Sequence, residues 1–226
     1  MLSNAQILGV DDAHVLAVDG NDSLQRLEGK TLAAFYRLRQ AAAADGIALT
    51  IASGHRDFFR QQKIWNNKAT GKSVLRNIEG DVIPFEAMSS RELLAVIMRW
   101  SALPGASRHH WGSDFDVYDA AAVDDDYQLQ LVPEEYQSTG VFSALTVWLD
   151  KQWREGKFTD FYRPYDIDRG GVAPEPWHLS YRPVAEICQQ RLTPVLLTEL
   201  LSKHDIALSA LCLSDIEALY QRYISL

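Results

Sequence analysis

The sequence is poor in cysteine and in long hydrophobic runs, and it lacks an excess of basic residues. Cys188 and Cys212 are too few for a disulfide framework and are wrongly spaced for a metal site, so we expect both to be buried apolar side chains. No stretch approaches the roughly 20 apolar residues that a membrane-spanning helix needs. Because 30 Asp and Glu outnumber 22 Lys and Arg, nucleic acid and anionic membranes are unfavourable partners.

The composition is nevertheless that of a folded protein. Hydrophobic residues make up 47% of the 226 residues, enough apolar material for a core, and this length predicts one domain over 1–226. The first residues do not show the basic region and apolar run of a signal peptide, which favours a cytoplasmic protein without a membrane anchor. The sequence leaves the oligomeric state open.

Helical and strand patterns are mixed along the chain without regular alternation. Residues 114–118 alternate between carboxylate-bearing or tyrosine positions and apolar ones, which predicts a half-buried strand with its polar side chains on one face. We therefore predict an α+β fold with a small, mainly antiparallel sheet flanked by helices. The expected strands are 47–52, 114–118 and one beginning near Trp177, and the expected helices are 24–45, 58–69, one from the Ser89–Glu92 capping box, 141–153, one from Thr193-Pro194 and one from the Ser214–Glu217 capping box.

A first group of candidate residues lies in the segment SRHHWGSDFD. His109 and Asp116 stand seven residues apart across a glycine turn, which can bring an imidazole and a carboxylate to one metal ion. Zinc binds both donor types, and a catalytic zinc site keeps three protein ligands and an open position for water. A third ligand must then come from elsewhere in the chain; the adjacent His110 is not expected to be it.

The segment EPWH offers that third ligand. It contains His178 and, three residues earlier, Glu175, which is either a further ligand or a general base. Pro174 and Pro176 disfavour a helical arrangement of this pair, so we expect the histidine at the start of a strand. From the residues alone, a zinc hydrolase centre and a set of structurally satisfied histidines both remain open.

Three blocks of sequence, taken together, resemble a known family. Residues 53–61 (SGHRDFFRQ), 107–116 (SRHHWGSDFD) and 175–178 (EPWH) are similar, in the same order, to motifs of the zinc D-alanyl-D-alanine carboxypeptidases and dipeptidases. This family includes vancomycin-resistance enzymes and shares its fold with the hedgehog signalling domain. The resemblance covers about residues 31–181 and leaves 182–226 as a C-terminal helical extension.

The resemblance implies a role for each matching residue. It implies one zinc ion per chain, with Glu175 as the base that activates a zinc-bound water and Arg56 as a cationic catalytic group. Arg108 is expected to join Arg56 in binding an anionic peptide terminus. The implied zinc ligands are His109, Asp116 and His178, and the implied substrate-binding residues are Ser107, Gln61, Trp177 and Asp114.

The implied activity is that of a metallo-carboxypeptidase that hydrolyses the C-terminal peptide bond of peptidoglycan stem peptides. His55, Asp57 and Asp114 depart from the usual motif residues beside the pocket, so D,D and L,D specificity stay open. The alternatives are a D,D-dipeptidase, a cell-wall endopeptidase, or a non-catalytic hedgehog-like zinc module that binds a partner or peptidoglycan. Such substrates imply a periplasmic or extracellular location, in contrast to the location favoured by the N-terminal sequence.

Overall fold

One antiparallel sheet carries most of the candidate residues. The structure is a computed structural model that describes residues 1–20, 23–77 and 80–225. Four strands pair in the order β3-β6-β8-β7, and the pairs β1-β2 and β4-β5 form two small sheets of their own. The strands are β1 (Val15–Ala17), β2 (Arg26–Glu28), β3 (Leu49–Ser53), β4 (Leu75–Arg76), β5 (Val82–Ile83), β6 (Asp114–Asp119), β7 (Phe161–Tyr162) and β8 (His178–Tyr181).

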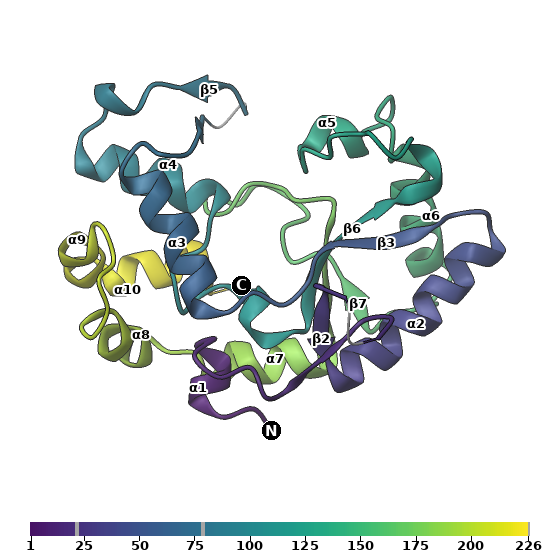
Figure 1. The fold of residues 1–226 in the computed structure, drawn as a ribbon, viewed down its shortest axis with the longest axis horizontal. Coiled ribbons are helices and arrows are strands. Elements are labelled where there is room, and N and C mark those ends of the chain that lie inside the picture. Colours follow the sequence, from purple (N-terminus) through teal and green to yellow (C-terminus); the bar gives the residue numbers. More distant parts are fainter. Residues whose placement is uncertain (21–22, 78–79, 226) are drawn as a thin grey trace.

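Helices lie on both sides of this sheet, and the candidate residues lie between the two groups. Helices α2 and α6 flank the sheet at the right of Figure 1, whereas α3, α4 and α8–α10 lie at the left. The helices are α1 (Asn4–Ile7), α2 (Gly29–Ala44), α3 (Phe58–Ala69), η1 (Phe85–Ala87), α4 (Ser90–Trp100), η2 (Arg108–Trp111), η3 (Ala120–Ala122), α5 (Pro133–Tyr136), α6 (Ser143–Arg154), α7 (Arg182–Arg191), α8 (Pro194–Leu201), α9 (Ser209–Ser214), α10 (Ile216–Leu219) and η4 (Tyr220–Ile224).

The register of β6 brings the site residues together. Asp116 is paired with Ser53 of β3 on one side and with His178 of β8 on the other. Directly opposed residues of an antiparallel pair have Cβ atoms about 4.5–5.5 Å apart, so the register alone makes Asp116 and His178 neighbours. Asp114 is two residues earlier and therefore points to the same face of the sheet. The prediction that a histidine begins this strand is confirmed, because β8 starts at His178.

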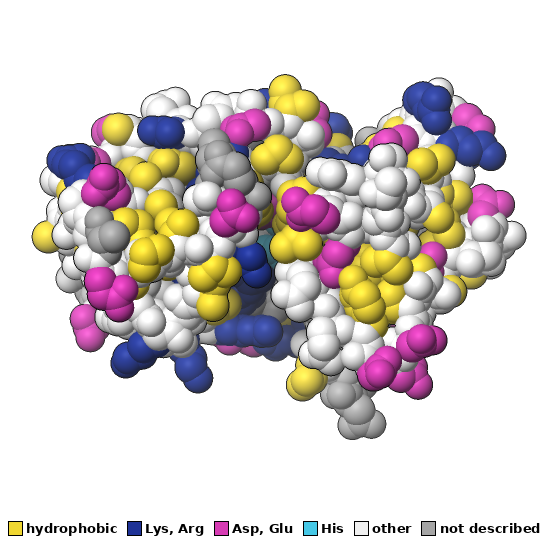
Figure 2. Space-filling model, turned by 90° about the horizontal axis from the view of Figure 1, so that it is seen from above, with side chains coloured by type: hydrophobic (Ala, Val, Ile, Leu, Met, Phe, Trp, Pro, Cys, Tyr) yellow, Lys and Arg dark blue, Asp and Glu magenta, His cyan; other side chains and the backbone are white. Residues whose placement is uncertain are grey.

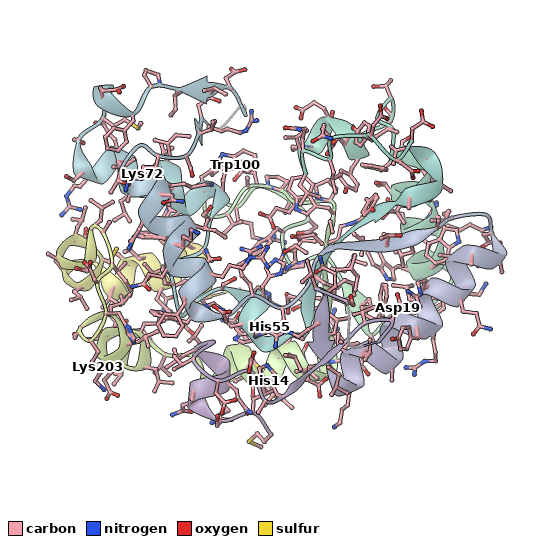
Figure 3. All side chains as sticks on the ribbon, in the orientation of Figure 1. His14, Asp19, His55, Lys72, Trp100 and Lys203 are labelled. Atoms are coloured by element: carbon pink, nitrogen blue, oxygen red, sulfur yellow. The ribbon has the colours of Figure 1, made fainter. Side chains whose placement is uncertain are left out.

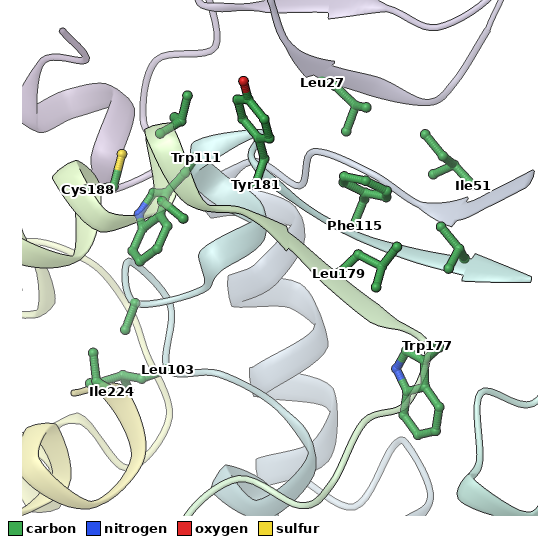
Figure 4. Close-up of a cluster of buried hydrophobic side chains, with 14 of the residues drawn as sticks. Leu27, Ile51, Leu103, Trp111, Phe115, Trp177, Leu179, Tyr181, Cys188 and Ile224 are labelled. Atoms are coloured by element: carbon green, nitrogen blue, oxygen red, sulfur yellow. The ribbon is translucent and has the colours of Figure 1, made fainter. Parts of the chain in front are cut away.

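The opposite face of β6 belongs to the hydrophobic core. Phe115 is fully buried and meets Phe35 of α2 and Phe161 of β7 edge to face, with ring centroids 5.4 and 5.9 Å apart. Figure 4 shows Phe115 grouped with Leu179 and Ile51. Since Asp114 and Asp116 are buried as well, β6 is covered on both faces rather than half-buried as its alternation predicts. The cysteine prediction is confirmed: both are free and buried.

The N-terminal half of the chain differs from the prediction at one helix boundary. The helix expected over 24–45 begins at Gly29, because residues 26–28 pair with β1 as strand β2. The Glu28 carboxylate accepts hydrogen bonds from the first backbone amides of α2 and so fixes its start. Helix α3, the Ser89–Glu92 capping box of α4, and helix α6 agree with the prediction.

The C-terminal part contains a helix that the pattern did not reveal. Helix α7 starts directly after β8, with Pro183 in its first turn, where a missing N–H costs nothing. The helix at Thr193-Pro194 is confirmed, but the capping box expected at Ser214 does not form, because Ser214 is the last residue of α9 and its hydroxyl donates to the Leu211 carbonyl. In the described ranges, every helix is too short or too polar to cross a membrane.

The turn between η2 and β6 depends on Gly112. This residue has a φ of 66°, and a Cβ atom built on it would lie 2.7 Å from both the Glu28 backbone nitrogen and a Val15 side-chain carbon. Its carbonyl accepts a hydrogen bond from the Glu28 amide, at 2.9 Å. The turn that separates His109 from Asp116 is therefore locked against the small sheet β1-β2.

Gly112→Ala should destabilise the protein more than Gly156→Ala. Both positions have positive φ, which costs a non-glycine residue about 1–2 kcal/mol, but no atom lies within 4 Å of a Cβ at Gly156. The steric clash at Gly112 should add about 1–3 kcal/mol. Denaturant unfolding of both variants measures the difference, and equal losses would contradict this account of the turn.

Candidate metal centre and its cleft

Three predicted ligands converge between η2, β6 and β8. One donor atom from each of His109, Asp116 and His178 lies within 4.8 Å of the other two. His109 Nε2 lies 3.5 Å from Asp116 Oδ2, and His178 Nδ1 lies 3.3 Å from Asp116 Oδ1. Since zinc bonds to nitrogen and oxygen are about 2.0–2.2 Å, tetrahedral geometry places neighbouring ligand atoms roughly 3.3–3.6 Å apart. The two ligand pairs match this spacing.

The hydrogen bonds of the two imidazoles leave the inward-facing nitrogens available. His109 Nδ1 lies 2.9 Å from the Gly54 carbonyl oxygen, to which it donates, so Nε2 keeps its lone pair. His178 Nε2 lies 3.2 Å from Asp114 Oδ1, so Nδ1 is the ring nitrogen available to bind a metal ion. Ligand histidines in metal sites are commonly oriented by such bonds to a carbonyl or carboxylate.

Asp114 lies behind His178 and is held by a buried ion pair. The Nε atom of Arg108 donates to Asp114 Oδ1 at 2.6 Å, and the Ser113 hydroxyl donates to Oδ2 at 2.7 Å. The Arg108 guanidinium also donates to Ser180 and stacks on Trp111, with 4.7 Å from its carbon to the ring centroid. Arg108 borders the cleft, but these hydrogen bonds direct its guanidinium to Asp114 and Ser180, so the expected contact with a substrate terminus stays a prediction.

His110, the second histidine of the motif, ties two segments together. Its Nδ1 donates to the Arg56 carbonyl at 2.6 Å, and its Nε2 accepts from the Gly105 amide at 3.1 Å. The Arg56 amide in turn donates to the His109 carbonyl at 3.2 Å. The loop that carries Arg56 is therefore fastened to the turn that carries His109, and His110 points away from the ligand cluster.

Glu175 stands beside the three ligands without joining them. Its Oε2 lies 3.1 Å from His178 Nδ1, and its side chain, 14% exposed, reaches the cleft. The segment is fixed by two backbone bonds, from the Glu175 amide to the Tyr165 carbonyl and from the His178 amide to the Glu175 carbonyl. This placement suits a carboxylate that handles protons next to a metal.

Burial and mutual charge set the pKa values in the cluster. Burial lowers the pKa of His109 to about 3, whereas burial raises the pKa of Glu175 above its usual value. Burial acts against ionisation of Asp116 too, but His109, His178 and Arg56 together outweigh it and lower the pKa of that carboxyl. Burial disfavours the His178 cation, yet the surrounding carboxylates of Asp114, Asp116 and Glu175 raise the pKa of His178 well above its usual value. Three carboxylates surround one imidazole, and a bound cation would offset their negative charge.

The donor set fits a zinc ion. Asp116 Oδ1 is buried and has no hydrogen-bond partner among the described residues, although it faces the ring nitrogen of His178. Once zinc displaces the proton of His178, two imidazole nitrogens and one carboxylate would form a three-ligand set of the kind that catalytic zinc sites use. His109, Asp116 and His178 would hold the ion, and Asp114 and Gly54 would orient the two histidines.

Arg56 approaches the cluster from the loop between β3 and α3. One guanidinium nitrogen donates to Gln61 Oε1 at 2.8 Å and another to the Ser53 hydroxyl at 3.2 Å. Its Nε is buried and has no partner in the described part of the chain. Gln61 is fully buried, and its side-chain amide also donates to the Ala102 carbonyl at 2.7 Å. Gln61 therefore positions Arg56 rather than lining the cleft itself.

A cleft of about 570 Å³ opens above the cluster. Seen from above in Figure 2, it is a groove between the two groups of helices, with basic side chains in its depth. One wall comes from the β4-β5 hairpin and Trp100, labelled in Figure 3, and the other comes from residues 130–134. Of the predicted site residues, the lining includes Arg56, Ser107, His109, Asp116, Glu175, Trp177 and His178.

The remaining predicted residues lie elsewhere. Asp114 and Gln61 are fully buried one layer behind the cleft surface, which differs from the expected contact with substrate. His55, at a departure from the motif, packs against His14 with ring centroids 5.6 Å apart, and both are labelled in Figure 3. Asp57 caps α3 by accepting from the Arg60 amide.

Two further cleft residues escaped the sequence analysis. Lys68 on α3 lines the cleft seven residues after Gln61, a spacing that places both on one helix face and could have revealed it. Tyr165 lies in a coil, and no pattern marks it; its ring meets His178 edge to face at 5.2 Å. Burial raises the pKa of Tyr165 to about 12, so its hydroxyl remains a hydrogen-bond donor at neutral pH.

A three-ligand cluster on an antiparallel sheet, with a free carboxylate beside it in a cleft, defines a mononuclear metallohydrolase site. Residues 24–184 match the family described as VanY, D-alanyl-D-alanine carboxypeptidase. The chain belongs to this D-alanyl-D-alanine carboxypeptidase family. The resemblance inferred from the three sequence blocks is confirmed, and the match reaches slightly beyond 31–181 on both sides.

Individual proteins are similar to this chain. An uncharacterized protein of Haemophilus influenzae is 32% identical over 124 residues, which cover 54% of this chain and 92% of the relative. A vancomycin-resistance D,D-pentapeptidase mutant in complex with Zn(II) is 23% identical, with a TM-score of 0.52 over 79% of this chain and 83% of its own. VanYB in complex with D-alanine-D-alanine is 22% identical, with a TM-score of 0.53 over 86% and 91%. The two structures confirm the predicted fold class.

Adding zinc to the metal-free protein should stabilise it. At a free zinc concentration of about 100 times Kd, binding to the folded state alone adds roughly 2.7 kcal/mol to the free energy of unfolding. Thermal or denaturant unfolding with and without zinc checks this, and His178→Ala is the control that should lose the effect. A similar zinc response in His178→Ala would contradict the assigned ligand set.

Asp114→Asn should weaken zinc binding without a direct effect on substrate. Loss of the charge behind His178 is expected to lower zinc affinity about 10- to 100-fold, as for other carboxylates that orient ligand histidines. Competition with a chelating dye measures this affinity, with Asp150→Asn, which affects only a partly exposed pair with Arg163, as the control. Unchanged zinc affinity together with a raised KM would instead place Asp114 in substrate binding.

Proposed function

We propose that this chain is a zinc-dependent carboxypeptidase that removes the C-terminal residue from peptidoglycan stem peptides ending in D-Ala-D-Ala. The observation that carries the proposal is the position of Glu175, a partly buried carboxylate 3.1 Å from a proposed ligand nitrogen and open to a cleft that also contains Arg56. Membership of the D-alanyl-D-alanine carboxypeptidase family supports the same reaction.

In this proposal different side chains bind the metal and transfer the proton during peptide hydrolysis. A zinc ion at His109, Asp116 and His178 supplies Lewis acidity, which makes water more acidic and polarises a carbonyl. Glu175 Oε2 takes the proton of the attacking water and returns it to the leaving amine. The amine leaves as the C–N bond breaks, and the water oxygen stays on the new carboxylate.

Arg56 provides the positive charge that faces the reacting peptide. Its guanidinium is fixed by Ser53 and Gln61, so it needs no rearrangement to stabilise negative charge that develops on the carbonyl oxygen. Ser107 and Trp177 line the same cleft, and Trp177 packs on Tyr136 with ring centroids 5.5 Å apart. These two residues are proposed to contact the peptide.

The direct test combines metal content with mass-spectrometric product analysis. The zinc-loaded protein is incubated with stem peptides ending in D-Ala-D-Ala, with peptides ending in a single D-Ala on an L-centre, and with a cross-linked dimer. Release of one D-Ala from the first substrate is expected. Release of a dipeptide or cutting of the cross-bridge would replace the proposal with a dipeptidase or an endopeptidase, and release from the second substrate alone would make the enzyme L,D-specific.

Two other outcomes would overturn the proposal. One zinc ion per chain with binding of wall fragments and no cleavage of any peptide would favour the non-catalytic zinc module. Failure to bind zinc at all would remove the basis of the proposed chemistry.

Glu175→Gln should retain zinc and lose turnover. Because a positioned general base contributes about 10²- to 10⁴-fold, kcat should fall by that factor while the zinc content stays at that of the native protein. The exposed Glu199→Gln on α8 is the control and should match the native enzyme. A zinc-loaded, fully active Glu175→Gln enzyme would show that Glu175 is not the base.

A further inference from the structure

Lys68 is a cation in the wall of the cleft that neither the sequence motifs nor the family match assigns. It belongs to helix α3, is half-buried, and lines the same cleft as Arg56 and Glu175. Its ammonium donates one hydrogen bond, to the Ser101 hydroxyl at 2.7 Å. An ammonium has three N–H donors, so two remain for another partner.

Lys68 and Arg56 are anchored to adjacent residues of one segment. Arg56 is held by Gln61, which donates to the Ala102 carbonyl, and Lys68 donates to the side chain of Ser101. Consecutive Cα atoms are only about 3.8 Å apart, so these anchors hold the two cations at the same part of the cleft. Ser101 and Ala102 also belong to the cleft lining.

Across the described ranges, neither Arg56 nor Lys68 has a carboxylate partner of the kind that three other cations of the chain possess. Arg99 pairs with Asp168, Arg108 with Asp114, and Arg163 with Asp150. Among the residues that the structure describes, no carboxylate lies within salt-bridge distance of Arg56 or Lys68. Burial lowers the pKa of Lys68 to about 8, and repulsion between Lys68 and the Arg56 cation contributes to this shift. An unpaired, partly desolvated cation is costly, and an anionic ligand would relieve that cost.

We propose that Lys68 determines specificity by binding, together with Arg56, the free C-terminal carboxylate of the peptide substrate. This inference rests on the proposed carboxypeptidase function and assigns a residue to the recognition of the terminus that such a reaction requires. Two free N–H donors of Lys68 and the guanidinium of Arg56 offer charge-assisted hydrogen bonds to the two carboxylate oxygens. A peptide with an amidated C-terminus would leave the Lys68 cation unpaired in the cleft.

The kinetic test compares Lys68→Met on a peptide acid and on the same peptide with a C-terminal amide. Loss of a hydrogen bond to a charged group should lower kcat/KM for the acid about 10- to 100-fold, mainly through KM, and leave kcat/KM for the amide nearly unchanged. Lys63→Met, which removes an exposed lysine of the same helix, is the matched control and should behave as the native enzyme. Lys68→Arg, which keeps the charge, should recover part of the preference for the acid.

An equal loss on both substrates, or no loss on the acid, would overturn the proposal. A third peptide, with its internal carboxylates amidated and its C-terminus free, identifies the carboxylate that is bound. If the effect of Lys68→Met disappears with this peptide, Lys68 binds an internal carboxylate and the assignment to the terminus is wrong. Unchanged thermal unfolding of Lys68→Met, measured alongside, excludes loss of the fold as the cause.

A binding measurement separates this proposal from the proposed activity. Calorimetric titration of D-alanyl-D-alanine and its amide into the zinc-loaded Glu175→Gln protein requires no turnover. The proposal expects the additional substitution Lys68→Met to weaken binding of the acid about 10- to 100-fold and to spare the amide. If the native enzyme cleaves nothing while this difference persists, only the proposed function fails; if cleavage occurs and the difference is absent, only the role of Lys68 fails.

Discussion

The buried ion pair between Arg108 and Asp114 is the interaction on which the centre depends. Removing two charges from water is expensive, and here the cost is offset by close contact and by additional hydrogen bonds from Ser113 and to Ser180. Against the effect of burial, the guanidinium holds the pKa of Asp114 well below its usual range. Asp114 therefore stays ionised behind His178 and fixes which ring nitrogen faces the cleft.

Strand β6 connects this support to the chemistry. Asp114 and Asp116 share one face, so the first orients His178 and the second belongs to the proposed ligand set, while Phe115 between them anchors the strand in the core. A slip of one residue in register would exchange the carboxylate face with the core face. The two-sided burial of β6 makes that slip costly, and the geometry of the centre follows from ordinary sheet packing.

The ligand motifs were predictable from the sequence because they are local. The Gly112 turn, the prolines around Glu175 and the resemblance of three blocks indicated the ligand set and the fold class. The pairing of Arg108 with Asp114 is not predictable in this way, because it depends on tertiary contacts that a single sequence does not display. For the same reason Gln61 was placed in the cleft instead of behind Arg56. Within the helix expected over 24–45, residues 26–28 form a strand instead, because pairing with β1 outweighs helical spacing.

The walls of the cleft, unlike its floor, are built from segments outside the four-stranded sheet. The β4-β5 hairpin and residues 130–134 line the cleft but belong neither to the four-stranded sheet nor to the ligand set. Each is a local excursion of the chain, and its length is not constrained by the register of β6. The length and sequence of both segments can therefore change without disturbing the strand register that positions the three-residue cluster.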